Sequence, residues 1–286
     1  MSQLLTDETA IVTGGASGIG RLIALTFADH GADVVVADVR ETPRGGGEPT
    51  HEQITSETDQ TAVFVDCDVT ERADLEAAVD AADDLGGLDI MVNNAGIHSE
   101  TPFLDITEEE FDQLMDINVK GVFLGAQVAG ERLIENDDGG TIINMASLAA
   151  DRGAAYQTIY TASKGAVKSL TYALADFFGG HGVRVNAIKP SFTETQMLEQ
   201  GGMGEGEAGT RLQEAMLGAT PAGRFGQPEE IANVALFLAS DLSSYVNGES
   251  VLVDRGLENT YQRKTESSAS VNRRFNHRLL ATPLPN

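Results

Sequence analysis

The chain has 286 residues, 41% of them hydrophobic, which is enough to bury one large core. Its 44 acidic and 19 basic residues give a net charge of −25, which excludes nucleic acid as a partner. The single cysteine, Cys67, excludes an intrachain disulfide, and the lack of a long apolar run or a signal segment predicts a cytoplasmic protein with no membrane partner.

Short β-branched runs alternate with longer helical patterns along the chain. The first of these units predicts a strand at residues 10–13, a helix at 18–30 and a strand at 33–38. Further strands are predicted at 62–65, 88–92, 141–145, 183–188 and 250–253, and the helices between them include 70–85 and 156–178. Such alternation places parallel strands in one sheet with helices on both faces. The predicted fold is therefore α/β, a single doubly wound Rossmann domain.

Two segments interrupt this alternation. Residues 40–60 are polar and contain glycine and proline, which predicts an exposed loop with a short helix before the third strand. Residues 191–220 include the run GGMGEGEAG, and a loop of this length in a compact domain is typical of a lid over a site.

The first strand-to-helix junction, residues 13–20, reads TGGASGIG. Glycines at such a junction allow a tight turn and let a pyrophosphate approach the backbone at the N-terminus of the helix. The position between a strand and an amphipathic helix is the context that this motif requires. We therefore expect a dinucleotide to bind at Gly14, Ser17, Gly18, Ile19 and Gly20.

The second predicted strand ends at Asp38, 18 residues after the last glycine of this motif. A carboxylate there can accept hydrogen bonds from both ribose hydroxyls of the adenosine and would repel a 2′-phosphate. This position predicts NAD as the cofactor. Arg40, two residues later, leaves a weaker NADP activity open.

Tyr160 and Lys164 form a YxxxK motif, thirteen residues after Ser147. A free tyrosine has a pKa of about 10, so it needs a nearby cation to act as a base at neutral pH. A lysine four residues later lies on the same helix face and can supply that charge. Ser147 can then hydrogen-bond the substrate oxygen while Tyr160 removes or returns its proton.

Over residues 5–256 the chain resembles the short-chain dehydrogenase/reductase family, because the glycine fingerprint and YxxxK recur with further motifs in the family's order. The resemblance implies an adenine-side pair at Asp68 and Val69. It implies that Asn94, Ala95 and Gly96 line the cofactor cleft, and that Tyr160 and Lys164 contact the cofactor as well as acting in catalysis.

Two more groups of residues follow from the same resemblance. Asn118 falls on the family's asparagine that holds a proton-relay water, and Ser147 falls on its active-site serine. In the run KPSFTET, the resemblance implies that Pro190, Thr193 and Thr195 meet the nicotinamide carboxamide. Ser191 replaces the family's glycine there, and Arg255 stands where a glycine is usual. Neither residue is as free as glycine to adopt positive φ.

The resemblance implies an NAD(H)-dependent oxidoreductase that moves a hydride between nicotinamide and a secondary alcohol, hemiacetal or carbonyl carbon. Three acidic residues near the predicted cleft, Glu100, Glu194 and Glu199, favour a small-molecule substrate such as a sugar or polyol. A 3-oxoacyl thioester reductase is the alternative, although an acidic acyl carrier would prefer a basic approach surface. A non-catalytic nucleotide-sensing regulator is another, but such a protein would be expected to have lost its tyrosine or lysine.

The five histidines do not cluster with cysteines or carboxylates at metal-ligand spacing, so no metal is expected. His98, just after the predicted cleft segment, is interpreted as a surface histidine rather than a substrate contact.

The last 30 residues differ from the rest of the chain in charge. They contain five lysines and arginines against two glutamates, which divides the chain into a catalytic domain at 1–256 and a basic tail at 257–286. Only five lysines occur in the whole chain, and with the acidic excess this resembles proteins of salt-accumulating halophiles, where salt screens the repulsion. The family resemblance also implies symmetric assembly, and we expect a homotetramer or a homodimer.

Overall fold

The computed structural model describes residues 3–136, 139–195, 214 and 216–259. Seven strands form one parallel sheet in the order β3-β2-β1-β4-β5-β6-β7. Their bounds are β1 Thr9–Thr13, β2 Asp33–Asp38, β3 Ala62–Asp66, β4 Ile90–Asn93, β5 Gly140–Met145, β6 Val183–Pro190 and β7 Ser250–Val253. The order reverses between β1 and β4, which is the switch point of a doubly wound sheet. The predicted single Rossmann domain is confirmed.

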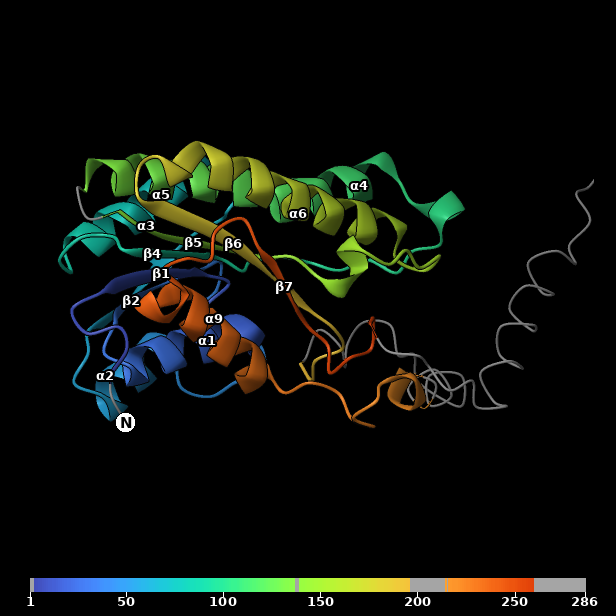
Figure 1. Cartoon of the computed structure of the whole chain (residues 1–286), viewed down its shortest axis with the longest axis horizontal. Helices are drawn as coiled ribbons and strands as arrows, with labels where there is room; N and C mark the ends of the chain where they lie inside the picture. The colour runs from blue at the N-terminus through green and yellow to red at the C-terminus, as the bar shows by residue number, and fades with distance from the viewer. Residues whose placement is uncertain (1–2, 137–138, 196–213, 215, 260–286) are drawn as a thin grey trace, which may run out of the picture.

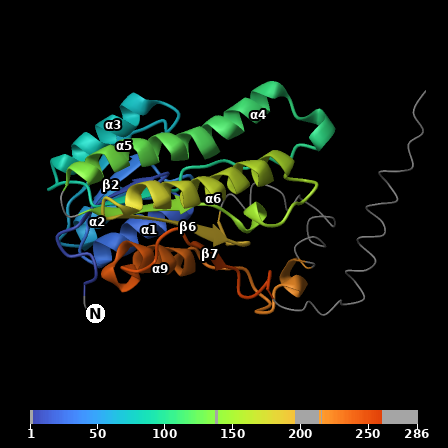
Figure 2. The same cartoon turned by 45° about the horizontal axis from the view of Figure 1, so that its top comes forward.

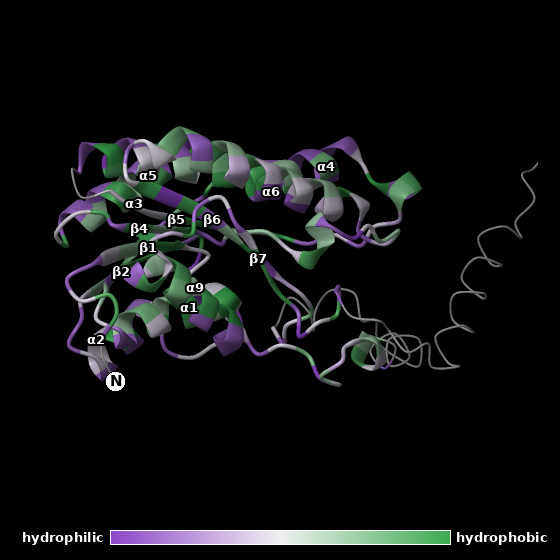
Figure 3. Ribbon diagram, in the orientation of Figure 1, coloured by the Kyte–Doolittle hydropathy of each residue, from purple (hydrophilic) through white to green (hydrophobic). Residues whose placement is uncertain are grey.

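Helices cover both faces of this sheet (Figure 1). One layer contains α1 Gly18–Asp29, α2 Thr50–Glu57 and α9 Pro228–Ala239. The other contains α3 Arg72–Asp83, α4 Glu108–Met115, α5 Gly121–Glu135 and α6 Thr158–Gly179. The outer helices mix hydrophilic and hydrophobic residues, as expected for helices that turn one side to the sheet and one to solvent (Figure 3).

The strands form because their β-branched side chains can be buried on both faces. In β2, Val34 and Val36 pack into the core under α1 and α9, whereas Val35 and Ala37 pack into the core under α3 and α5. Successive side chains of a strand point to opposite faces, so an uninterrupted apolar run fits only a sheet covered on both sides. All five residues of β1 are buried for the same reason.

α4 and α5 follow each other along one line (Figure 2), joined by a single π-helical turn, η2 Asp116–Lys120. A π turn accommodates one extra residue in a helix and is found mostly at functional sites. Here it contains Asn118, which is fully buried. The structure also contains three short 3₁₀ turns, η1 Phe103–Asp105, η3 Leu148–Ala150 and η4 Asp241–Ser243.

Several boundaries differ from the sequence prediction. The long helix predicted from residue 156 begins two residues later, at Thr158, because Gln157 has a ψ of 44° and lies outside the helical range. The predicted short helix in the 40–60 segment is α2. Most of the predicted lid, residues 196–213 and 215, lies outside the described residues, as do Glu199 and the tail from residue 260. Across the described ranges, none of the helices is both long and apolar enough to cross a membrane.

Candidate active site

The glycine turn lies at the carboxyl end of β1, next to β4 at the switch point of the sheet. Gly14 and Gly18 have φ values of 65° and 57°, which favour glycine. A Cβ on Gly20 would lie 2.3 Å from the Gly14 carbonyl oxygen, so only glycine fits where the helix meets the turn. Ser17 is the N-cap of α1 but makes no side-chain cap, so its hydroxyl does not occupy the amide N–H groups of the first helical turn. These amides can hold an anionic group.

Asp38 ends β2 next to this turn. Its carboxylate accepts hydrogen bonds from the Ala16 N–H at 3.1 Å and the Arg40 N–H at 3.2 Å. Burial raises the pKa of Asp38, and these hydrogen bonds and the charges of Arg40 and Arg44 oppose that rise. The Arg44 N–H also donates to Ser17 Oγ at 2.9 Å, which brings the loop after β2 over the glycine turn. The predicted ribose acceptor and pyrophosphate turn are therefore neighbours.

The NNAG segment follows β4 and is anchored to the glycine turn. The Asn94 backbone N–H donates to Thr13 Oγ1 at 2.9 Å, and its side chain donates to the Thr13 carbonyl at 2.9 Å. The Ala95 N–H donates to the same threonine hydroxyl at 3.1 Å. A Cβ on Gly96 would lie 3.2 Å from Asn118 Oδ1 and 3.5 Å from Lys164 Nζ. This segment thus connects the glycine turn to the YxxxK helix.

The adenine-side pair lies after β3. Asp68 is exposed and accepts hydrogen bonds from the backbone and hydroxyl of Thr70, at 2.9 and 2.8 Å. Val69 is buried, and a Cβ on Gly121 would come within 2.7 Å of its side chain. With the uncapped α1 N-terminus, the open space around Gly18 and the half-buried Asp38 carboxylate, these residues fit a dinucleotide.

Ser147, Tyr160 and Lys164 meet where β5 ends and α6 begins. Ser147 hydrogen-bonds Tyr160, and Lys164 Nζ lies 5.7 Å from the centre of the tyrosine ring. Burial raises the pKa of Tyr160, and the hydrogen bond with Ser147 offsets only part of that rise. Lys164 is buried, donates to the Met145 carbonyl at 2.8 Å, and has its pKa lowered by burial to about 8. The phenol is therefore protonated at neutral pH, beside a lysine that is still charged.

Asn118 connects the loop after β4 to α6. Its Oδ1 accepts from the Ile97 N–H at 2.8 Å, and its Nδ2 donates to the Ile97 carbonyl at 2.9 Å and to Ser163 Oγ at 3.2 Å. The amide is thus occupied by protein groups. A proton-relay role for Asn118 stays a prediction, and it would require a group of this residue other than the side-chain amide.

The predicted carboxamide contacts lie at the end of β6. Pro190 is the last residue of that strand and pairs with Val253 of β7. Thr193 is buried, pairs with Gly226 and donates from Oγ1 to the Ser191 carbonyl at 3.1 Å. Thr195 is half-buried. Ser191 has no positive φ, so its replacement of glycine causes no strain, whereas Arg255 keeps the glycine-like backbone with φ of 51°.

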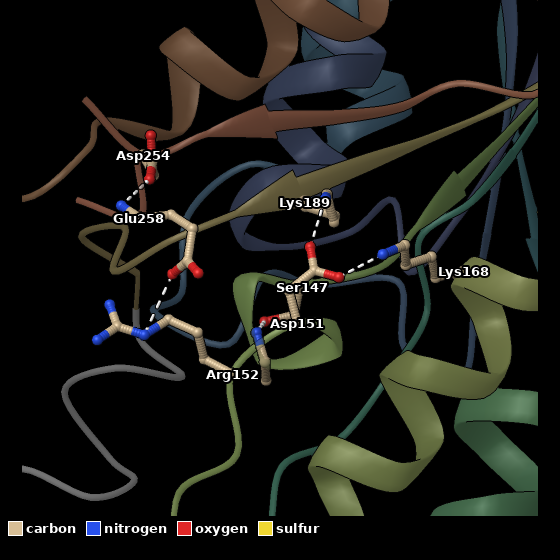
Figure 4. A network of polar contacts seen from close by, with 8 residues as sticks. Ser147, Asp151, Arg152, Lys168, Lys189, Asp254 and Glu258 are labelled. Carbon is tan, nitrogen blue, oxygen red and sulfur yellow. Dashed lines mark hydrogen bonds and ion pairs between the residues drawn. The ribbon is translucent and has the colours of Figure 1, made fainter. Parts of the chain in front are cut away.

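A charged network supports the turn that follows Ser147 (Figure 4). Asp151 forms ion pairs with Lys168 of α6 and with Lys189 of β6. Burial raises the pKa of Asp151, but these two lysines hold it below its usual value. Arg152 pairs with Glu258 at 3.1 Å, so the C-terminal turn of the described chain also contacts this loop. Sequence reasoning missed the network, and a lysine inside the buried strand run NAIKP was the signal for it.

His98 is not a surface residue, which corrects the sequence interpretation. Its side chain is only 17% exposed. The ring packs edge-on against Tyr160, with centroids 4.6 Å apart, and Nε2 lies 3.2 Å from Gln157 Oε1. The loop after β4 turns this histidine toward the start of α6, a long-range contact that local sequence does not encode. No group of three or more metal-ligating side chains occurs in the part of the chain that the structure describes.

Known proteins resemble this chain over most of its length. The family model described as enoyl-(acyl carrier protein) reductase matches residues 14–258. The L-2,3-butanediol dehydrogenase of Corynebacterium glutamicum is 40% identical over 88% of this chain and 98% of its own. The NAD-dependent glycerol dehydrogenase of Listeria innocua is 36% identical over 88% of this chain and 94% of its own.

A solved structure agrees with these sequence relatives. The short-chain type dehydrogenase/reductase from Mycobacterium marinum has a TM-score of 0.80 and 35% identity, covering 90% of this chain and 97% of that one. These relatives match 88–90% of this chain. The matched chain has the sheet order, the glycine turn and the contact of Ser147 with Tyr160 described above. The protein belongs to the short-chain dehydrogenase/reductase family and is an oxidoreductase.

Proposed function

We propose that the protein is an NAD(H)-dependent dehydrogenase that interconverts a secondary hydroxyl of a sugar or polyol and the corresponding carbonyl. The observation that supports this most strongly is the hydrogen bond between Ser147 and the Tyr160 phenol beside a buried lysine. A non-catalytic regulator would have no reason to keep a buried Lys164 whose pKa is lowered to about 8.

In this proposal the side chains handle the proton. Tyr160 Oη takes the proton of the substrate hydroxyl during oxidation and returns it during reduction. Ser147 Oγ binds the same substrate oxygen and so fixes its distance from the phenol. The Lys164 ammonium, charged below about pH 8, favours the phenolate form of Tyr160. A bound nicotinamide would accept or donate the hydride at the carbon that carries this oxygen.

The choice of NAD is supported by Asp38, whose half-buried carboxylate lies within 3.1 Å of the Ala16 N–H in the glycine turn. A ribose 2′-hydroxyl can donate to this carboxylate, while a 2′-phosphate would be repelled by it. Arg40 and Arg44 lie close enough to affect the pKa of Asp38. They offer positive charge to a 2′-phosphate, so a weaker activity with NADP stays open.

The substrate class is supported by the relatives. Two of them are named for butanediol and for glycerol, compounds that have hydroxyls on adjacent carbons. The polar residues His98 and Gln157 beside Tyr160 suit such a substrate better than an acyl chain. The 3-oxoacyl thioester reductase is kept as the second candidate because of the description of the matching family model.

One screen tests this function. NAD and NADP are each offered with sugars, polyols, secondary alcohols and steroids, and NADH and NADPH with 3-oxoacyl thioesters, in buffers with and without molar salt. We expect the largest kcat/KM with NAD and a polyol or sugar. A thioester with a higher kcat/KM than every polyol would establish the second candidate instead, and NADP preferred over NAD would reject the cofactor assignment.

We further propose a homotetramer or homodimer that works in concentrated salt. Large apolar side chains are exposed on one helical layer, including Phe103 at 65%, Phe123 at 45% and Phe177 at 64%. Burying them between subunits is favourable, but the net charge of −25 opposes association unless salt screens it.

A further inference from the structure

The polar pair formed by His98 and Gln157 has no part in the proton transfer described above, yet it lies against the tyrosine that performs it. His98 comes from the loop after β4, and Gln157 directly precedes α6, three residues before Tyr160. The imidazole packs edge-on against the phenol ring at 4.6 Å and 70°. Two separate elements therefore bring hydrogen-bonding groups to one side of the proposed acid/base.

The hydrogen-bonding capacity of this pair is only partly used within the protein. His98 Nε2 donates to Gln157 Oε1 at 3.2 Å, because a carboxamide oxygen can only accept. The other ring nitrogen, Nδ1, lies 3.8 Å from Glu100 Oε1, which is too long for a hydrogen bond. Among the described residues, the Gln157 amide NH₂ has no hydrogen-bond partner. The pair thus offers an acceptor or a second donor on the histidine and two donors on the glutamine.

A hydroxyl group is the ligand that matches this combination, since it both donates and accepts. Tyr160 and Ser147 hold the oxygen on the reacting carbon in the proposed reaction, and the pair packs directly beside Tyr160. The next polar group of a bound substrate would therefore meet His98 and Gln157. An acyl chain at this place would leave the pair unsatisfied in a partly buried position, at a cost in binding.

We propose that His98 and Gln157 bind the hydroxyl or carbonyl oxygen on the carbon next to the reacting carbon, which makes the enzyme selective for vicinal diols and α-hydroxyketones. This inference rests on the proposed function and refines its substrate class. A site built to hydrogen-bond a hydroxyl discriminates against the analogue without it, because the polar groups of the site are then buried unpaired.

The test compares 2,3-butanediol with 2-butanol, which lacks only the second hydroxyl. His98→Phe keeps an aromatic ring against Tyr160 but removes both ring nitrogens, and Gln157→Leu removes the carboxamide. We expect each variant to lower kcat/KM for the diol by about 30-fold or more, and that for 2-butanol by less than about threefold. His98→Gln should restore part of the preference for the diol. The same histidine-to-phenylalanine change at the exposed His181 serves as the control and should alter neither value.

Changes that lower both substrates equally would show a structural role and reject the inference. So would a wild-type enzyme that uses the two alcohols equally well, although the proposed dehydrogenase function would then stand. If the wild type oxidises neither alcohol nor any polyol with NAD or NADP, the proposed function itself fails. NADH binding and thermal unfolding of each variant show whether it is folded, and Gln157→Leu keeps the test decisive if His98→Phe does not fold.

Discussion

A single oxygen atom distinguishes Tyr160 from phenylalanine, and that oxygen carries the transferable proton in the proposed reaction. We expect Tyr160→Phe to lower kcat by at least about 10³-fold while the Kd for NADH changes little, because the ring and its packing remain. Steady-state rates and fluorescence titration with NADH measure the two effects. Tyr156→Phe removes the same atom from a side chain that is 37% exposed and should keep full activity. Turnover of Tyr160→Phe at a tenth of wild type or more would contradict the role.

The protonation states of Tyr160 and Lys164 predict opposite pH behaviour for the two directions of the reaction. Burial raises the pKa of Tyr160, so below that pKa its phenolate fraction grows about tenfold per pH unit. Oxidation needs the phenolate, and kcat/KM should rise about tenfold per pH unit between pH 6 and 8, where Lys164 is charged. Above about pH 8 the lysine loses its charge, and the rise should become less steep.

Reduction needs the protonated phenol, which predominates throughout this window. Its kcat/KM should therefore change by no more than about twofold between pH 6 and 8. Initial rates in both directions across the pH range check the pair of predictions. An oxidation rate that is flat from pH 6 to 8 would mean that another group takes the proton.

Asp38 is expected to determine cofactor choice. Asp38→Ser should lower kcat/KM for NAD and raise the NADP-to-NAD ratio by about 10- to 100-fold, because the ribose acceptor is lost and the repulsion of a 2′-phosphate disappears. Asp66 pairs with Asp38 across β2 and β3 and is exposed, so Asp66→Ser is a matched control. A ratio that shifts equally in both variants would indicate a general charge effect rather than a ribose contact.

At the level of single residues, the sequence motifs located the glycine turn, Asp38 and the group of Ser147, Tyr160 and Lys164, which the structure brings together at the carboxyl ends of the strands. They could not locate His98 or Gln157 as partners. That contact depends on how the loop after β4 folds onto α6, and no local pattern encodes it. The use of the Asn118 amide by Ile97 and Ser163 was hidden for the same reason.

At the level of elements, the strands were the most predictable part of the fold. Their apolar runs are buried on both faces and leave little choice of position, as β2 shows with Val34 and Val35 in opposite cores. Helix ends were less predictable. The start of α6 depends on the backbone of Gln157, and the π turn at residues 116–120 has no period that distinguishes it from a helix.

The turn at Asp254–Glu258 is an element whose removal should affect the active site. Leu257 is buried, the Glu258 N–H donates to Asp254 Oδ2 at 2.6 Å, and Glu258 pairs with Arg152 in the loop after Ser147. A chain that ends at Asn259 should keep wild-type kinetics. A chain that ends at Gly256 should lose about 1.5–3 kcal/mol of stability from Leu257 alone and show a higher KM.

The ion pair between Glu258 and Arg152 can be tested separately from the packing of this turn. Glu258→Arg should raise KM, and the double variant Arg152→Glu with Glu258→Arg should recover part of the loss by restoring opposite charges. Steady-state kinetics and thermal unfolding are measured for the two shortened chains and for these two variants. Together they separate the contribution of the packing from that of the ion pair. Equal KM values for the chains that end at 256 and 259 would show that the turn does not position the loop.

At the scale of the whole molecule, the net charge of −25 is the dominant property. We expect the oligomer to persist in molar KCl and to dissociate below a few tenths molar, because the Debye length grows from about 3 Å at 1 M to about 10 Å at 0.1 M. Light scattering across a salt titration measures this. A monomer in molar salt would contradict the assembly proposal, and a tetramer unaffected by low salt would contradict its dependence on screening.

The position of the two ends of the described chain affects how the enzyme can be handled. Residues 3–8 precede β1 and so lie at the amino ends of the strands, whereas the turn at Asp254–Glu258 contacts the loop after Ser147 at their carboxyl ends. An affinity tag or surface anchor attached before β1 is thus separated from the cofactor cleft by the length of the sheet. One attached directly after residue 259 would start beside the loop after Ser147. Immobilisation through the N-terminus should leave access to the site open.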